Sequence, residues 1–373
     1  MKIIILCRSL CAGGAERQLV ELAKGLRSGG NDVMVVLFYG GGELEGELQA
    51  ADVNIMTLNK RGRWDAYANI VRLARIIKHF RPDILHGYMP SANIVSVIMK
   101  LFCSKLKVVW GVRSSYMDLS HYDLTARILY KLEPKLSHFA DTVIVNSHAG
   151  YKHAVKSGYH AKKLVVIQNG IDTESFCPNR EAGKRVRAEL GVNDDEILIG
   201  IVARFDPLKD HELFLRAASL VSMKRPDARY VCIGDGPAEY RDMLKERAKE
   251  LGVSHAVIWA GARNDMSDIY NAIDLVVNAS YCEGFSNVIG EAMSCGVPCV
   301  VTDVGDSAEI VGDCGYVVPP KDPERLTDAI MRILSLQLGG LREMGLRGRE
   351  RMVSCFSTPR MLERTTAILE EIS

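Results

Sequence analysis

The sequence lacks a hydrophobic run long enough to cross a membrane. Its best candidate, "NIVSVIMKLF" at 93–102, is interrupted by Lys100, whereas a spanning helix needs about 20 apolar residues. The apolar start "MKIIILC" is cut short by Arg8, so we interpret it as a first strand and not as a signal peptide. Any membrane contact is therefore expected to be peripheral.

Paired-cysteine and phosphate-loop motifs are also missing. The ten cysteines are scattered without a CxxC spacing, which indicates reduced thiols and favours a cytoplasmic protein. No GxGxxG or GK[ST] stretch occurs, so a nicotinamide cofactor and a P-loop find little support.

Aromatic residues are scarce, at 7% of 373 residues, while 47% are hydrophobic and 25% are charged. This profile is typical of an ordinary α/β protein, and the length predicts two domains. The net charge of +1 hides an asymmetry, because residues 1–178 hold 23 Lys and Arg against 15 Asp and Glu, and the rest hold 24 against 31. An anionic partner for the first half and an uneven spread of solvated lysines both remain open.

Short apolar runs alternate with amphipathic helical stretches on both sides of a polar stretch at 170–195. The pattern predicts parallel sheets in two doubly wound, Rossmann-like domains, at 1–175 and 190–356, with a linker between them. A last helix at about 357–373 is expected to pack back onto the first domain. Ligands of such sheets bind at the carboxyl ends of the strands, here in an inter-domain cleft. The expected strands are 2–7, 32–38, 53–58, 83–87, 107–112, 142–147 and 163–169, then 197–203, 228–234, 256–261, 274–280, 298–303 and 315–318.

Two acids eight positions apart, Glu283 and Glu291, flank the stretch "EGFSNVIGE" after the apolar run "DLVVNAS". A helix that begins near Asn287 would point its N–H groups and positive dipole end at a phosphate. Glu291 would accept from two ribose hydroxyls and Glu283 from a second polyol, so the pair predicts a sugar-nucleotide site. The alternative is that Glu291 is a surface helix residue and Glu283 a loop acid.

Two further stretches follow predicted strands. "IVARFDPLKDHELF" places Arg204 and Lys209 five positions apart, and two fixed cations can neutralise a pyrophosphate leaving group. "SLCAGGAERQLVELA" places Gly13 and Gly14 before a helix, where backbone N–H groups can approach an anion. Taken singly, Arg204 or Lys209 is better explained as a solvated surface charge, and their position at a strand end in the same domain as the two acids favours the functional interpretation.

Together these motifs resemble the retaining GT-B glycosyltransferases of glycosyltransferase family 4. The resemblance covers nearly the whole chain in the right order. The matching stretches are "GGAER" (13–17), "NGID" (169–172), "ARFDPLKD" (203–210), "IGDGP" (233–237), "WAGARNDM" (259–266) and "EGFSNVIGEAMSCGVPCVVTDVGDSAEIV" (283–311).

The resemblance implies a role for each matching position. Glu283 would lie beside the donor sugar at the reacting face, Glu291 would hold the ribose, and Arg204 with Lys209 would bind the diphosphate. It also implies retention of anomeric configuration by front-face attack, no cofactor and no metal, and the sequence has no DxD motif. The remaining donor contacts would come from the backbone of Gly284, Phe285, Ser286 and Asn287, from Gly14 of the first domain, and from Arg263 beside the nucleobase.

One position departs from the family pattern. Many relatives have a histidine after the fifth strand of the first domain, whereas this chain reads "VVWGVRSSYMD" with Arg113 there, and His121 is out of register. Arg113 either contacts a phosphate or acidic sugar of the acceptor or donor, or is structural.

The acceptor side is marked by basic residues among apolar ones. "KRGRW" (60–64, with Trp64), "RLARIIKHFR" (72–81) and "RILYKLEPKLSHF" (127–139) either hold the chain on anionic lipid or pack their apolar faces on the sheet. Nucleic acid is a poorer partner, because no recognition motif interleaves with these charges.

The resemblance therefore predicts transfer of a hexose or N-acetylhexosamine from a nucleotide sugar, expected to be a UDP-sugar, to a hydroxyl group. The expected acceptor is a lipid-linked or polysaccharide glycan of the bacterial cell surface, reached from the cytoplasm or the cytoplasmic face of the inner membrane. The alternatives are a non-catalytic nucleotide-sugar-binding subunit and a GT-B sugar-nucleotide epimerase.

Overall fold

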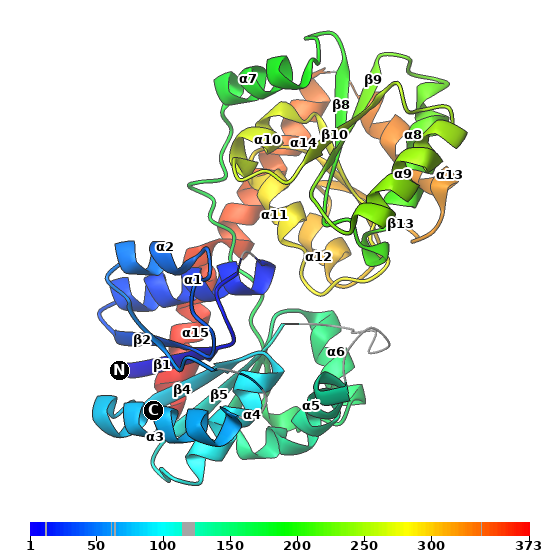
Figure 1. Ribbon diagram of the computed structural model, residues 1–373. Helices are drawn as coiled ribbons and strands as arrows, with labels where there is room; N and C mark the ends of the chain where they lie inside the picture. The colour runs from blue at the N-terminus through cyan, green and yellow to red at the C-terminus, as the bar shows by residue number, and fades with distance from the viewer. Residues whose placement is uncertain (12, 61, 63–64, 114–123, 337) are drawn as a thin grey trace. The chain divides into compact units, whose positions relative to one another are not determined.

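The computed structural model describes residues 1–373 except 12, 61, 63–64, 114–123 and 337. The chain divides into two compact units, Met1–Gly170 with Thr358–Ser373, and Ile171–Ser357 (Figure 1). Trp64 and His121 lie outside the described residues.

The first unit is built on a seven-stranded parallel sheet. Its strand order is β3-β2-β1-β4-β5-β6-β7, so β1 lies between β2 and β4. Strand β1 (KIIILC) is buried from Ile3 to Cys7, as expected for a central strand covered on both faces. The strands are β1 (Lys2–Cys7), β2 (Asp32–Leu37), β3 (Asn54–Thr57), β4 (Ile84–Tyr88), β5 (Lys107–Val112), β6 (Thr142–Val145) and β7 (Leu164–Val166).

Helices cover both faces of this sheet (Figure 1). Ile3 and Ile5 pack with side chains of α1 and α15 in one core, while Ile4 and Leu6 pack with α3 and α4 in another. The alternation of β1 side chains thus supplies two cores from one strand. The helices are α1 (Gly14–Ser28), α2 (Glu45–Ala50), α3 (Ala66–Phe80), α4 (Pro90–Lys100), α5 (Leu124–Leu136), α6 (His148–Lys156) and α15 (Thr358–Ile372), with short 3-10 turns η3 (Ser137–Phe139) and η4 (Ala161–Lys163).

The second unit repeats the plan with six parallel strands in the order β10-β9-β8-β11-β12-β13. Ile199 and Ile201 of β8 pack with α8, α9 and α13, and Leu198 packs on the other face with α7, α10 and α11. The strands are β8 (Ile197–Val202), β9 (Ala228–Ile233), β10 (Val257–Gly261), β11 (Leu275–Asn278), β12 (Cys299–Thr302) and β13 (Gly315–Val318). The helices are α7 (Arg180–Leu190), α8 (His211–Ser222), α9 (Ala238–Glu250), α10 (Met266–Ala272), α11 (Asn287–Ser294), α12 (Ser307–Val311), α13 (Pro323–Leu334) and α14 (Leu338–Arg351), with η5 (Pro207–Lys209) and the π-helical η6 (Met352–Phe356).

Every strand expected from the sequence is present, and the ends agree to within three residues. The stretch interpreted as a linker, 170–195, was wrong in part. Residues 180–190 form α7, which begins at the Asn179 cap, whose side chain accepts from the Ala182 N–H at 3.2 Å. α7 buries only the small side chains of Ala182 and Val186 together with Gly183, so its apolar stripe is too narrow to stand out from its polar composition.

The boundaries of the two compact units differ from those of the domains expected from the sequence. The second unit begins at Ile171 and ends at Ser357. The helix α15 belongs to the first unit, on which the last helix was expected to pack, and Met361 and Leu369 lie in the same core as α1. Among the described residues, no helix is both long and apolar enough to cross a bilayer.

A carboxylate lies in the core of the first unit. Glu133 of α5 is 1% exposed, and Asn93 of α4 donates to its Oε1 at 2.6 Å. Burial is the main cause that raises the pKa of Glu133 to about 7, opposed by hydrogen bonds from Asn93 and Tyr159. The folded state therefore binds this proton more tightly than the unfolded chain does, for which the ordinary pKa is about 4.5.

We expect the stability contributed by protonated Glu133 to be complete below about pH 4.5 and lost as pH rises through about 7. Urea unfolding of the wild type and of Glu133→Gln at pH 5 and pH 8 measures this. Between pH 5 and pH 8, the free energy of unfolding of the wild type should fall by up to about 3 kcal/mol relative to that of the variant. A difference between the two proteins that does not change with pH would contradict the assignment, and groups present in both, such as His86, cancel in the comparison.

Candidate functional site

The order of strands in the second unit places its site. The connections from β8 and β11, which are neighbours in the sheet, lead to opposite sides, and the crevice at the carboxyl ends of such a strand pair is where open α/β sheets bind ligands. Arg204 and Lys209 follow β8, and Glu283 and Asn287 follow β11. The topology therefore gathers residues that lie about 80 positions apart in the chain.

Lys209 and Glu283 form an ion pair between these two loops. Lys209 Nζ donates to Glu283 Oε1 at 2.6 Å, and Ser280 Oγ donates to the same oxygen at 2.7 Å. The side chains of Lys209 and Glu283 are 23% and 11% exposed, so the pair is largely withdrawn from water. The local chain supports this position, because Asp206 accepts from the Leu208 N–H at 2.9 Å and begins η5, which ends at Lys209.

Arg204 lies on the same loop but away from this pair. Its side chain is 78% exposed, and its guanidinium approaches Asp206 at 3.5 Å. The structure thus brings Lys209 to Glu283 but leaves Arg204 extended from the carboxyl end of β8.

Glu291 is fixed by a tyrosine from a different helix. Tyr270 of α10 is fully buried, and its hydroxyl donates to Glu291 Oε2 at 2.7 Å. Burial, followed by the charge of Glu291, raises the pKa of Tyr270 well above its ordinary value, so the tyrosine stays a donor. The sequence pointed to Glu291 but not to Tyr270, whose only signal was an aromatic residue on the buried face of a short amphipathic stretch.

The first turn of α11 lies between the two acids. Its cap residue Ser286 makes no side-chain hydrogen bond to the helix; instead, Ser286 Oγ accepts from Asn278 Nδ2 at 2.9 Å, at the end of β11. Phe285 is 6% exposed and packs on Phe356 with ring centroids 5.7 Å apart, so this residue can offer a ligand only its backbone. The side chain of Ser286 therefore does not cap the N-terminus of α11, where the helix dipole has its positive end.

The turn at Glu283 and Gly284 rests on the loop after β12. Asp306 N–H donates to the Gly284 carbonyl at 2.9 Å, and a Cβ at Gly305 would lie 2.5 Å from that carbonyl oxygen and 2.6 Å from the carbonyl oxygen of Glu283. Gly305 also has φ +60°, a conformation that favours glycine. Neither Gly305 nor Asp306 was identified as a site residue from the sequence, although both lie in the matching stretch.

Arg263 lies after the edge strand β10, two strands from β8. Its Nε donates to Asp265 Oδ1 at 2.8 Å and its Nη2 to Glu189 Oε2 at 3.1 Å. Hydrogen bonds to these carboxylates, Asp265 first, raise the pKa of Arg263. The guanidinium is thus already neutralised by two acids and does not join the cations of the β8 loop.

In the first unit, Gly14 begins α1 and is exposed. The carboxylate of Glu16 folds back against Gly13, where it would meet any added Cβ. Partial burial raises the pKa of Glu16. The N-terminus of α1 thus carries an acid of its own chain.

Arg113 follows β5 and lies over the ring of Tyr88, with its guanidinium carbon 4.5 Å from the ring centroid. Its Nη1 donates to Asn169 Oδ1 at 3.1 Å. No ion pair of Arg113 occurs within the described part of the chain, so neutral groups hold this cation. His86 beneath it is fully buried, and burial, then the charge of Arg113, lowers the pKa of His86 to about 3.

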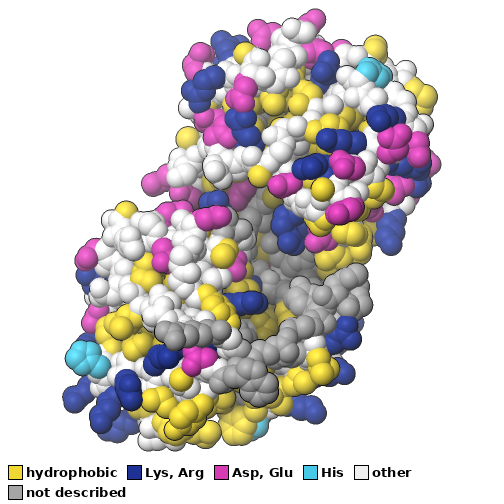
Figure 2. Space-filling model, viewed as in Figure 1, with side chains coloured by type: hydrophobic (Ala, Val, Ile, Leu, Met, Phe, Trp, Pro, Cys, Tyr) yellow, Lys and Arg dark blue, Asp and Glu magenta, His cyan; other side chains and the backbone are white. Residues whose placement is uncertain are grey.

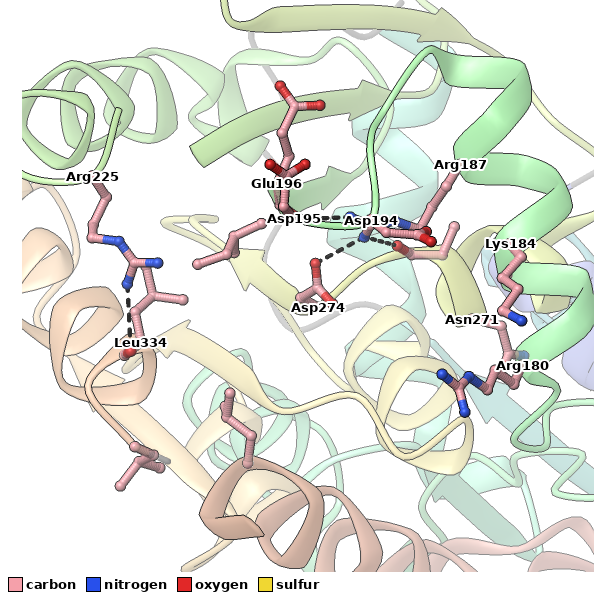
Figure 3. A pocket seen from close by; sticks show the side chains of 15 residues that line it. Arg180, Lys184, Arg187, Asp194, Asp195, Glu196, Arg225, Asn271, Asp274 and Leu334 are labelled. Atoms are coloured by element: carbon pink, nitrogen blue, oxygen red, sulfur yellow. Dashed lines mark hydrogen bonds and ion pairs between the residues drawn. The ribbon is translucent and has the colours of Figure 1, made fainter. Parts of the chain in front are cut away.

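A cavity of about 640 Å³ lies at the opposite, amino-terminal edge of the second sheet (Figure 3). Ile197 at the start of β8 and Asp274 before β11 line it. Some of its charges are paired within the chain, since Arg187 binds Asp274 at 2.9 Å and Arg225 binds Asp227 at 2.6 Å. None of the residues expected at the site lines this cavity.

Metal ligands do not gather in the described residues: no group of three or more His, Cys, Asp and Glu side chains there has a metal-binding arrangement. None of the ten cysteines forms a disulfide.

Two family models match the chain. The model for Glycosyltransferase Family 4 matches residues 12–175, and the model for Glycosyl transferases group 1 matches residues 196–336.

Curated relatives include the D-inositol 3-phosphate glycosyltransferase of Corynebacterium urealyticum, 35% identical over 208 residues, which are 52% of this chain and 49% of that protein. The chain thus spans about half the length of that relative. The UDP-Gal:alpha-D-GlcNAc-diphosphoundecaprenol alpha-1,3-galactosyltransferase of Escherichia coli is 24% identical over 79% of this chain and 77% of its own length.

Among solved structures, HepE of Anabaena in complex with UDP-glucose superposes with a TM-score of 0.86 at 22% identity, over 100% of both chains. This likeness shows the fold, a GT-B arrangement of two Rossmann-like α/β domains, and confirms the expected fold class.

The contact at Gly305 leads to a prediction about the site loop. In Gly305→Ala, alanine must adopt a left-handed backbone conformation, and its methyl group also lies against the carbonyl groups of Gly284 and Glu283. We therefore expect this variant to lower the free energy of unfolding by about 1–3 kcal/mol more than Gly191→Ala does. Gly191 is a matched control, because its φ is +69° and nothing lies within 4 Å of its Cβ position. Urea unfolding of both variants measures the difference, and equal losses would show that the loop contact is unimportant.

Proposed function

The chain is built from a Glycosyltransferase Family 4 domain and a Glycosyl transferases group 1 domain in the GT-B fold, and from this premise we propose that it is a retaining glycosyltransferase. Its donor is a UDP-sugar carrying a hexose or N-acetylhexosamine. Its acceptor is a hydroxyl of a lipid-linked or polysaccharide glycan in bacterial cell-surface biosynthesis. The observation that carries the proposal is the arrangement of Glu283, Lys209 and Glu291 around the N-terminus of α11.

The relatives support this choice of donor. HepE was solved with UDP-glucose, and the Escherichia coli relative is named for UDP-Gal and for a diphosphoundecaprenol-linked acceptor. A reduced cytoplasm, where we place the reaction, is compatible with ten cysteines that form no disulfide.

In the proposed donor complex, the diphosphate lies at the N-terminus of α11, where the N–H groups of the first turn and the helix dipole favour an anion. Glu291 accepts from the ribose hydroxyls, while the hydrogen bond from Tyr270 holds its carboxylate in place. Gly284, Phe285, Ser286 and Asn287 contribute backbone contacts, Arg263 lies beside the base, and Gly14 approaches the phosphate.

The proposed reaction breaks the bond between the sugar C1 and the diphosphate oxygen and forms a bond from C1 to the acceptor oxygen on the same face. The acceptor proton passes to the leaving phosphate. Lys209 and Arg204 stabilise the charge that develops there, which is why no metal is needed in this scheme. Glu283 orients the sugar through its hydroxyls while holding Lys209 in place.

We propose that Arg113 binds an anionic group of the acceptor or sugar, because the contacts that hold it within the described residues are with the neutral groups of Tyr88 and Asn169. In the turnover assay below, Arg113→Met should raise the KM for the acceptor or weaken donor binding. Unchanged values of both would make Arg113 structural.

Donor binding is tested first. We expect a UDP-sugar, among UDP-, GDP-, ADP- and CMP-sugars, to raise the melting temperature of the purified chain. Glu291→Ala should weaken its affinity by about tenfold to a hundredfold, the usual cost of losing hydrogen bonds to a charged group. Glu343→Ala, which removes an exposed acid of α14, is the control and should bind as the wild type does. No stabilisation by any of these sugars would sink the donor assignment.

Turnover is tested by release of UDP in the presence of a panel of glycan acceptors. Glu283→Gln and Lys209→Ala should lower kcat by about a hundredfold or more while both variants stay folded, and EDTA should leave the wild-type rate unchanged. Near-wild-type rates in both variants would refute these roles. Binding of the donor without any turnover would favour a non-catalytic subunit, and conversion of the nucleotide sugar without an acceptor would favour an epimerase.

A further inference from the structure

Helix α5 of the first unit exposes an apolar ridge. Leu124, Ile128 and Leu132 follow one another at intervals of four residues, so they lie on one face of the helix, and their exposed fractions are 73%, 53% and 40%. The helix is anchored instead through its buried side, where Glu133 binds Asn93 of α4. An amphipathic helix of a globular domain normally turns its apolar stripe to the core, and here such a stripe faces outward.

A second group of apolar side chains lies at the end of α4. Leu101 and Phe102 are 78% and 72% exposed, and Phe139 of η3 is 46% exposed. Lys100 Nζ donates to the Phe139 carbonyl at 3.2 Å, so η3 lies next to the end of α4. Because η3 directly continues α5, these side chains extend the ridge. We name the six residues Leu101, Phe102, Leu124, Ile128, Leu132 and Phe139 the apolar ridge.

Among the described residues, the exposed charges of α5 have one sign, and the acid Asp141, near Phe139, is paired with Lys100 at 2.6 Å. Arg127, Lys131 and Lys135 of α5 are exposed, while the only acid of the helix, Glu133, is buried. Lys105, close to Phe102 in the chain, is exposed as well. Figure 2 shows hydrophobic side chains with Lys and Arg among them along the edge of the first unit that carries α5. Apolar side chains flanked by cations are the surface that an anionic bilayer attracts.

Helix α3 shows that composition alone does not create this surface. It is also basic and apolar, but Leu73 is fully buried and Ile77 is 6% exposed, and both pack in the core beneath the sheet. Of the two described helices with this mixture, α3 uses its apolar face for the fold, and only α5 leaves one outside.

We propose that the apolar ridge and its flanking cations dock the first unit on an anionic lipid bilayer. Cations draw the chain to the lipid headgroups, and the apolar side chains enter the boundary between headgroups and acyl chains. The proposal goes beyond sugar transfer and rests on no residue of the donor site, so either can fail alone.

Co-sedimentation of the full chain with vesicles tests the proposal. We expect binding to vesicles of phosphatidylglycerol and phosphatidylcholine, little binding to phosphatidylcholine alone, and weaker binding as salt rises and screens the charges. Lys131→Glu with Lys135→Glu should weaken binding by about tenfold or more, and Ile128→Ser with Leu132→Ser should weaken it at every salt concentration.

Met223→Ser with Lys224→Glu is the matched control. Met223 is a 72% exposed apolar residue of the second unit beside an exposed lysine, so this pair should bind vesicles as the wild type does. All variants should retain the stabilisation by UDP-sugar, which separates this test from that of the donor site. Absence of binding to anionic vesicles, binding that ignores the α5 substitutions, or a dimer in solution that Ile128→Ser dissociates would overturn the proposal, the last in favour of a second copy of the chain.

Discussion

The ion pair between Lys209 and Glu283 is the interaction on which the rest of the second unit's site depends. It joins a loop that follows β8 to a loop that follows β11, and both side chains are largely removed from water. A buried charge is costly unless it is paired and hydrogen-bonded. Ser280 supplies the additional hydrogen bond to Glu283. The ion pair therefore holds the two loops in one relative position, because breaking it would leave Lys209 and Glu283 as poorly solvated, unpaired charges.

The backbone around this pair is built to bring the loops that close together. Tyr281 N–H donates to the Leu208 carbonyl at 3.0 Å, which links the same two loops a second time. Gly234, with φ +142°, lies where a Cβ would collide with the Ala203 carbonyl, so the loop after β9 can press against the chain that carries Arg204. These contacts satisfy backbone polar groups that would otherwise be buried without partners. They also fix the backbone of the loops at the carboxyl ends of the strands, and thereby the positions of the charged side chains.

The sequence predicted those parts of the structure that depend on local pattern, and missed those that depend on contacts between distant segments. Buried parallel strands read as continuous apolar runs, so all of them could be found. Glu283 and Lys209 could be proposed because both follow predicted strands of the same domain, and the carboxyl ends of parallel strands meet at one edge of the sheet. No local sequence pattern indicates that Tyr270 donates a hydrogen bond to Glu291, that Asp306 donates one to Gly284, or that Arg263 binds two acids. Each of these pairs joins segments that only the folded chain brings together. α7 was missed for a different reason, since its small buried side chains make almost no apolar signal.

The way these acids are partnered bears on which ligands the site can accept. Each carboxylate already receives a hydrogen bond from the protein, Glu283 from Lys209 and Ser280 and Glu291 from Tyr270, so its orientation is set before any ligand arrives, which reduces the ordering cost of binding. A purely anionic ligand would gain from the α11 N-terminus but meet two carboxylates. A neutral polyol would satisfy the carboxylates but leave the positive helix end without a counter-charge. A molecule with an anionic centre flanked by hydroxyls on both sides would satisfy all three at once, and this is the order of groups in the UDP-sugar that we propose as the donor.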